Sequence, residues 1–280
     1  MGETLKASVL LASGRKMPMV GLGTYRLQGS NVHKSIKSAL SLGYRLIDTT
    51  PGMEAMTRIG ISGHPRPDLF LTIKTMHGDR ESAATLALRT MSALKVGFVD
   101  LLVLRSPAAR GMEPEHPRHL ELRMQGWKGL EKLHKEGKAL SLGVCDFSIA
   151  HLESLLQQCQ VPPSVQMAEI TPLNTNSPLI AFCKAHNIVL QAYSPLANGH
   201  SALLSHPKVL EIAANVGKSP CQVVLKWTIQ QGICVIPKSL KAEHQRENGN
   251  LDFCLSSDQM DQLSSLNTGF KIGWDSSNIA

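Results

Sequence analysis

The sequence lacks several features that would assign it to a specialised class. No apolar run approaches the ~20 residues that a membrane-spanning helix needs, and residues 1–9 lack the apolar core of a secretion signal. The six cysteines never form a Cys-x-x-Cys or Cys/His pair, so their spacing is not that of a zinc site or a disulfide framework. We therefore expect a soluble, cytoplasmic protein with reduced thiols, no metal and no membrane partner.

Aromatic residues and blocks of basic charge are also scarce. Only 4% of the residues are aromatic, and no five consecutive residues are basic although the formal net charge is +7. Nucleic-acid-binding surfaces usually combine clustered basic residues with stacking aromatics, so we expect no nucleic-acid partner. The positive charge fits either a small anionic ligand or a merely soluble basic surface.

The length of 280 residues exceeds a usual single domain, but it fits one α/β barrel of about 250 residues. No internal repeat or low-complexity linker divides the chain. We expect one domain over residues 1–280, acting as a monomer.

Short β-rich runs alternate with segments of helical periodicity along the chain. Strands are expected at residues 44–48, 69–74, 99–104, 141–144, 165–170, 188–193, 233–237 and 251–253. Helices are expected at residues 82–94, 127–135, 149–157, 179–186 and 221–230. The last helix follows Ser219, a suitable N-cap, and Pro220 at the first helical position. This alternation predicts the α/β class and a parallel (β/α)8 TIM barrel.

Two further stretches complete the predicted architecture. The Ser-Gly-Arg sequence at residues 13–15 indicates an N-terminal β-hairpin. A doubly wound open sheet is the alternative to the barrel, but its Gly-x-Gly-x-x-Gly loop is missing, and the Gly-Leu-Gly-Thr stretch at 21–24 only follows the hairpin. Residues 107–123 hold three prolines and two histidines, which predicts a long irregular loop over the active-site face of the barrel.

Two of the expected strands end on charges, Asp48 and Lys74, and a buried strand seldom ends so without a use for the charge. These residues belong to an ordered set of segments: GLGTYRL (21–27), GYRLIDT (43–49), FLTIKT (70–75), DLLVL (100–104), SLGV (141–144), QAYSPL (191–196), VIPKS (235–239) and EN (247–248). The set resembles the aldo-keto reductases from about residue 9 to residue 274. The resemblance implies a barrel that binds NADPH without a Gly-rich phosphate loop and reduces aldehydes or ketones at the carboxyl ends of the strands.

The resemblance carries over only half of the catalytic residues. The family uses an aspartate, a tyrosine, a lysine and a histidine; Asp48 and Lys74 match the first and third, whereas Met53 and Arg105 replace the tyrosine and the histidine. A thioether cannot donate a proton, and a guanidinium can stabilise an oxyanion but is a poor acid. Since a general acid contributes roughly 10²–10⁴ in rate, we expect weak or redirected carbonyl reduction. The alternative is a catalytically inactive relative that acts as a nucleotide-binding sensor or a structural protein.

Several alternatives remain open at the chemical end. Tyr25 matches an aromatic of the family's substrate pocket and is either a substitute acid or pocket wall. His77 is a second candidate acid, or a solvated loop histidine. The charges of Asp48, Lys74 and Arg105 could instead form a buried network that only holds the barrel mouth together. An anion between Lys74 and Arg105 is also conceivable, so the expected partner is a small carbonyl compound or an anionic ligand.

The resemblance assigns the cofactor contacts as well. Lys238 and Ser239 match residues that hold the adenosine 2′-phosphate, and Glu247 and Asn248 match those around the adenine. The family's arginine six residues after the lysine is His244 here, which weakens the phosphate clamp. The remaining contacts implied by the resemblance are Gly23, Thr24, Asp48, Ser194, Leu196 and Tyr193, the last stacking on the nicotinamide ring.

The partners of the nicotinamide amide are altered. Cys145 and Asp146 stand where the family has Ser-Asn, and Met167 replaces a glutamine. Asp146 can accept a hydrogen bond from the amide but cannot donate one to its carbonyl, and Met167 does neither well. Gln166 points to the opposite side of its strand and cannot substitute. Cys145 is either a redox-sensitive thiol or a plain buried cysteine.

Overall fold

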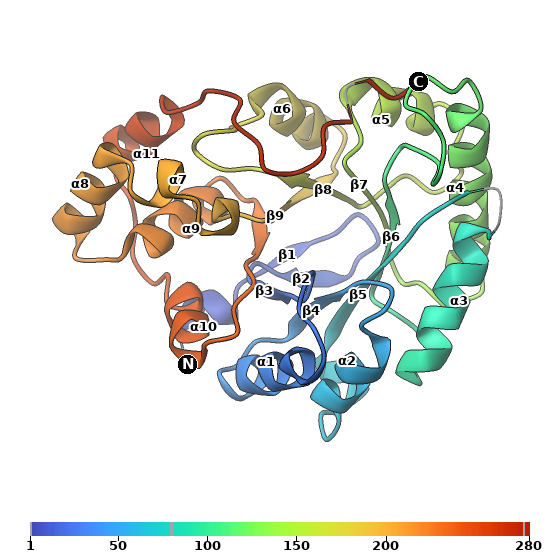
Figure 1. The fold of residues 1–280 in the computed structure, drawn as a ribbon, viewed down its shortest axis with the longest axis horizontal. Coiled ribbons are helices and arrows are strands. Elements are labelled where there is room, and N and C mark those ends of the chain that lie inside the picture. The colour runs from blue at the N-terminus through green and yellow to red at the C-terminus, as the bar shows by residue number, and fades with distance from the viewer. Residues whose placement is uncertain (1, 79–80, 277) are drawn as a thin grey trace.

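The protein is described by a computed structural model for residues 2–78, 81–276 and 278–280. Eight parallel strands form one sheet in which each strand pairs with the next along the chain (Figure 1). A parallel bridge from Val20 to Val235 joins the first and last strands and closes the barrel. This confirms the predicted (β/α)8 fold. The strands are β3 (Gly21–Gly23), β4 (Leu46–Thr49), β5 (Phe70–Thr75), β6 (Leu101–Arg105), β7 (Leu142–Cys145), β8 (Val165–Glu169), β9 (Val189–Tyr193) and β10 (Cys234–Ile236).

Helices cover the outside of the barrel (Figure 1), and most of them bury apolar residues in its core. Helix α10 instead buries Gln245, Asn248 and Gly249. Helix α9 starts as predicted, with Ser219 and Gln222 forming a reciprocal capping box and Pro220 in the first turn. The helices are α1 (Ser30–Ser41), α2 (Glu54–Ile61), α3 (Ala83–Leu94), α4 (His119–Lys135), α5 (Ile149–Leu156), α6 (Ser177–Ala185), α7 (Ser201–Leu204), α8 (Pro207–Val216), α9 (Pro220–Gln230), α10 (Ala242–Gly249) and α11 (Ser257–Ser264). None of the helices in these described ranges is long and apolar enough to cross a membrane.

Two predicted boundaries are wrong. Residues 251–253 form no strand, and Leu251 is buried in the core without sheet pairing. The eighth strand of the barrel is instead β3. Two of its three residues are glycines, which are depleted in strands, so the sequence does not predict it. The predicted loop 107–123 is also too long, because α4 already begins at His119. Its first turns bury His119, Leu122 and Arg123, so burial rather than apolar composition fixes this end of the helix.

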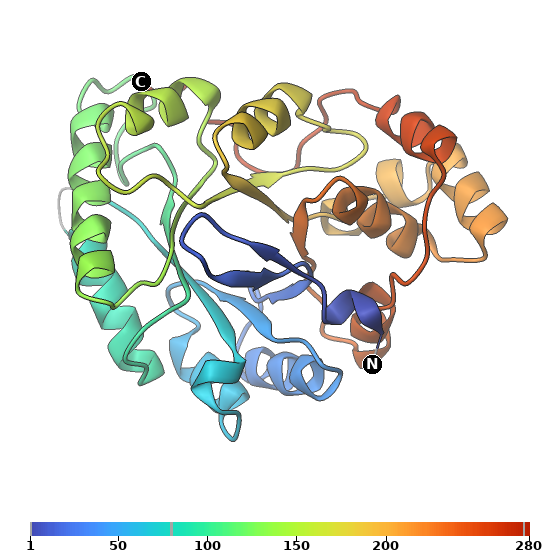
Figure 2. The ribbon, with the colours of Figure 1, turned by 180° about the vertical axis from the view of Figure 1, so that it is seen from behind.

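The N-terminal hairpin closes one end of the barrel. Strands β1 (Ser8–Leu10) and β2 (Lys16–Pro18) pair antiparallel, as predicted, and cross the amino-terminal end of the barrel (Figure 2). Leu11 and Met17 are buried there against barrel-interior residues such as Leu46 and Phe70. The hairpin therefore packs its apolar residues into the amino-terminal end of the barrel.

The last part of the chain crosses the open, carboxyl end of the barrel (Figure 1). The backbone N–H groups of Ile272 and Gly273 donate to the buried carboxylate of Glu169 at the end of β8. Further along, the carbonyl of Ile279 bonds to the ring of His151. These contacts hold the segment over the face on which Asp48 and Lys74 lie.

Candidate functional site

A cavity of about 490 Å³ opens at the carboxyl end of the barrel. Strand ends and the loops that follow them supply its walls, as expected for a (β/α)8 fold. It contains most of the residues that the sequence singles out: Gly23, Tyr25, Asp48, Lys74, Arg105, Cys145, Asp146, Tyr193, Ser194, Leu196, Lys238, Ser239, His244, Glu247 and Asn248.

Asp48 and Lys74 form a direct pair at the bottom of the chemical end. They come from the neighbouring strands β4 and β5, and Lys74 Nζ lies 2.6 Å from Asp48 Oδ1 and 2.5 Å from Oδ2. Burial raises the pKa of Asp48, against the opposing charges of Lys74 and Arg105. No ion pair joins Arg105 to Asp48 among the described residues. The predicted three-charge network is therefore a pair with a nearby third charge.

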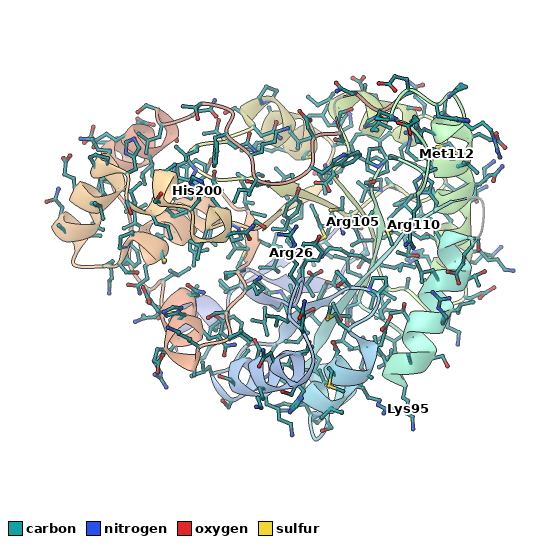
Figure 3. The ribbon with its side chains drawn as sticks, viewed as in Figure 1. Arg26, Lys95, Arg105, Arg110, Met112 and His200 are labelled. Atoms are coloured by element: carbon teal, nitrogen blue, oxygen red, sulfur yellow. The ribbon has the colours of Figure 1, made fainter. Side chains whose placement is uncertain are left out.

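Arg105 ends strand β6 and lies near Arg26, which follows β3 (Figure 3). Tyr25, the residue before Arg26, lines the same cavity. The guanidinium carbons of Arg26 and Arg105 each lie 5.3 Å from the centroid of the Tyr25 ring, within the usual range for cation–π contacts. Hydrogen bonding to Arg26 lowers the pKa of Tyr25, and Arg105 adds to this shift against the effect of burial. Tyr25 is therefore a better proton donor than an isolated tyrosine.

Three residues predicted for the site lie off the cavity wall. Met53 sits at the N-cap of α2 and packs against the hydrophobic core. Thr24 is buried and donates its hydroxyl to the Asp48 carbonyl at 2.9 Å. Met167 belongs to the barrel interior, and Gln166 on the other side of β8 donates to the Phe147 carbonyl. Their cofactor roles stay predictions.

His77 is not the solvated loop histidine that the sequence favours as the alternative to an acid. Its side chain is buried, at 3% exposure, and it does not line the cavity. Burial lowers the pKa of His77 to about 4, helped by the nearby Arg123 charge. A ring that is neutral and enclosed at pH 7 cannot serve the cavity as an acid.

Asp146 and Tyr193 line the cavity and are joined by a hydrogen bond. The Tyr193 hydroxyl donates to Asp146 Oδ1 at 2.5 Å, and burial raises the pKa of Asp146. Cys145 is buried beside them, and burial raises the pKa of its thiol well above the ordinary value. A thiol of this kind is unreactive, so the structure favours the plain buried cysteine. In the described ranges, no group of three His, Cys, Asp or Glu residues could hold a metal ion.

The other half of the cavity carries exposed positive charge. Lys238 and Ser239 follow β10, and His244, Glu247 and Asn248 lie on α10. A buried side chain behind them, Gln245, donates to the Ser239 carbonyl at 2.9 Å and to Ser35 on α1. This bond fixes the loop, so its polar groups are held in place before any ligand binds. No ion pair neutralises Lys238 in the part of the chain that the structure describes.

Several residues of the cavity are not predicted from the sequence. Arg26 is one of them, although a cation next to the pocket aromatic Tyr25 is a usable signal. The segment Ile272, Gly273 and Trp274 also lines the cavity. No sequence signal marks it, because its position depends on the distant carboxylate of Glu169. The other unpredicted lining residues are Thr50, Pro195, Asn198, Gly199, Leu204, Cys221, Ile236 and Pro237.

Comparison with known proteins agrees with this site and fold. The profile of the Aldo/keto reductase family matches residues 19–268. The chain is 35% identical to the uncharacterized oxidoreductase YtbE of Bacillus subtilis (strain 168), over 100% of this chain and 99% of the relative. It is 34% identical to the glyoxal reductase of the same organism, over 98% and 97%. For the methylglyoxal reductase DkgA of Escherichia coli (strain K12) the identity is 31%, over 95% and 96%.

A solved structure shares the whole architecture. The crystal structure of MGS-M4, an aldo-keto reductase enzyme from a Medee basin deep-sea metagenome library, superimposes with a TM-score of 0.89 at 31% identity, over 98% of this chain and 100% of that one. The family profile covers the barrel strands from β3 to β10, including the strand ends that carry Asp48 and Lys74. The chain belongs to the aldo/keto reductase family, whose members are oxidoreductases that act on carbonyl compounds.

Proposed function

We propose that this protein is an NADPH-dependent reductase of small aldehydes or ketones whose turnover is weak or redirected relative to members with the full catalytic set. One observation carries the proposal. A single cavity runs from the Asp48–Lys74 pair to Lys238 and Asn248, so a hydride donor anchored at one end can reach a carbonyl held at the other.

The cofactor half suits NADPH in its arrangement of charge. Lys238, Ser239 and the exposed His244 offer an ammonium, a hydroxyl and an imidazole to a phosphate dianion. Ser194 adopts a left-handed backbone, with φ at 45°, in the loop that would run beside the pyrophosphate. We propose Tyr193 as the stacking surface for the nicotinamide ring. Asp146, already bonded to Tyr193, would accept from the ring's amide.

The chemical half supplies charge and a proton. Bound NADPH would supply the hydride that adds to the carbonyl carbon. Arg105 would stabilise the growing negative charge on the carbonyl oxygen. Tyr25 would then protonate that oxygen, giving the alcohol, and regain its proton from solvent. We assign Lys74 and Asp48 to the electrostatic support of this end.

Met53 explains why turnover should be low. The residue that the family places there donates a proton, whereas Met53 packs against the core and has no proton to give. Tyr25 would act from a different side of the cavity, with one exposed edge (45% exposed). Water competes for such a group, so its proton transfer should be less efficient.

Two relatives are named for glyoxal and methylglyoxal, which makes small dicarbonyl compounds sensible first substrates. We further propose a cytoplasmic monomer whose residues 1–280 form one domain. The composition supports this part of the proposal.

The proposal is tested by NADPH fluorescence titration followed by turnover of glyoxal and methylglyoxal. We expect NADPH to bind more tightly than NADH, and Lys238→Gln to remove most of that preference. Turnover should be measurable but slow. The matched control is Lys95→Gln, which removes an exposed charge far from the cavity (Figure 3). Absence of NADPH binding would overturn the proposal, whereas NADPH binding with no turnover would identify a nucleotide-binding sensor instead.

A further inference from the structure

The cavity holds two guanidinium groups that no carboxylate pairs with. Arg26 and Arg105 both line it and both contact the ring of Tyr25. Within the described ranges no acidic side chain forms an ion pair with either of them. Figure 3 shows the two side chains together near the middle of the barrel face. Like charges so placed repel each other unless an anion lies between or beside them.

The acids nearest to them are already engaged. Both carboxylate oxygens of Asp48 accept from Lys74. Asp146 accepts from the Tyr193 hydroxyl on one oxygen and from the Cys145 thiol on the other. Neither donor to Asp146 is charged, and against the effect of burial the Asp146 charge raises the pKa of Arg105. Two carboxylates thus face three cations at this end of the cavity, which leaves an excess of positive charge.

The Lys74–Asp48 contacts change which residues can form the anion site that the sequence predicts. That site lay between Lys74 and Arg105, but the ammonium of Lys74 is committed to Asp48 at 2.5–2.6 Å. Arg26 is the cation that remains available. A guanidinium presents donors in a planar fork that matches a carboxylate, which an ammonium does not.

We propose that Arg26 and Arg105 form a binding site for a carboxylate carried by the substrate next to its carbonyl group. The inference rests on the proposed carbonyl reduction for the reaction, and it names the substrate class as 2-oxo acids, including the aldehyde glyoxylate. In such a compound a carboxylate oxygen and the carbonyl oxygen lie on adjacent carbons. One planar fork, that of Arg105, can donate to both oxygens, while Arg26, which also contacts the Tyr25 ring, would donate to the carboxylate.

Of the cofactor's phosphates, the 2′-phosphate is assigned to the Lys238 end of the cavity. Arg26 follows β3 and Arg105 ends β6, both at the chemical end. Arg26 also adopts a left-handed backbone conformation, with φ at 63°, which is uncommon for a residue with a side chain. The loop after β3 thus accepts an unfavourable backbone conformation at this position.

The test compares two small aldehydes that differ in charge, glyoxylate and glyoxal, with wild type, Arg26→Gln and Arg110→Gln. Arg110 is an exposed arginine off the cavity (Figure 3), so its variant controls for the loss of one positive charge. We expect wild type to show the higher kcat/KM for glyoxylate. Arg26→Gln should lower the ratio of the two kcat/KM values by roughly 10-fold, the usual effect of losing one charged hydrogen bond. Arg110→Gln should leave the ratio as in wild type.

A second measurement does not depend on turnover. Oxalate, an unreactive dicarboxylate, is titrated into the NADPH-saturated protein by calorimetry, at low and high salt. We expect binding that weakens in high salt and roughly 10-fold weaker binding by Arg26→Gln. An unchanged substrate ratio or unchanged oxalate affinity in Arg26→Gln would overturn the inference. Loss of turnover for both aldehydes with intact, Arg26-dependent oxalate binding would instead refute the proposed reaction and keep the anion site.

Discussion

At the scale of single residues, the proposed mechanism replaces one proton donor by another in a different place. Met53 cannot donate, whereas Tyr25 lies on the cavity wall in contact with two guanidinium groups. Hydrogen bonding to Arg26 and the charge of Arg105 lower the pKa of Tyr25, because both stabilise the tyrosinate that remains after proton transfer. In the proposed mechanism the guanidinium groups take the role of the family's lysine, which lowers the pKa of the proton donor.

Removing the hydroxyl tests this role. We expect Tyr25→Phe to lower kcat by about 10²-fold or more, since a positioned general acid contributes at least that much, while NADPH affinity stays within about twofold. Met53→Leu is the matched control, because it changes a side chain that packs against the core away from the cavity wall. Equal kcat values in wild type and Tyr25→Phe would show that the proton comes from elsewhere.

At the scale of elements, the barrel closes through a strand of only three residues. Gly23 at the end of β3 donates its N–H to the Pro237 carbonyl at 3.2 Å. A Cβ at this position would lie 2.8 Å from the carbonyl oxygen of Ile236 on β10, and backbone atoms cannot turn aside as a side chain can. Glycine is therefore required by the close approach of the first and last strands.

We expect Gly23→Ala to destabilise the fold by about 1–3 kcal/mol, the usual cost of forcing extra volume into a packed site. It should also weaken NADPH binding, because it displaces the loop that carries Lys238. Urea unfolding and cofactor titration measure the two effects. Gly97→Ala is the control, since a Cβ there meets no atom within 4 Å. Similar stability of the two variants would contradict the close-approach argument.

The elements also show how far sequence alone could lead. Apolar runs that end on Asp48 and Lys74 predict their strands, and Ser219 predicts the start of α9, because these signals are local. Strand β3 escaped prediction since a short strand with two glycines looks like a turn. The proximity of Arg26 and Arg105 could not be predicted either. The two residues are about eighty positions apart in the sequence, and only the barrel brings them to the same tyrosine ring.

At the scale of the whole molecule, buried histidines couple stability to pH. His77 is enclosed next to α4, where Gly126 leaves room for its ring. Burial lowers the pKa of His77 to about 4, and burial also lowers the pKa of His151, which bonds to the Ile279 carbonyl. Both folded-state values lie below the unfolded value of about 6.5. As the pH falls below 6.5, the unfolded chain therefore takes up protons first and the folded state loses stability.

For His77 alone, this proton uptake should lower the free energy of unfolding by about 2 kcal/mol between pH 7 and pH 5. Most of the loss should fall between pH 6.5 and pH 4, after which the folded ring is protonated too. His77→Gln should remove that share of the pH dependence, because an amide does not titrate, even if the variant is less stable at every pH. His186→Gln changes an exposed histidine and should keep the wild-type dependence of the unfolding free energy on pH. Urea unfolding at pH 7 and pH 5 measures the change in unfolding free energy between the two pH values. An equal change in wild type and His77→Gln would show that this ring is not the proton acceptor.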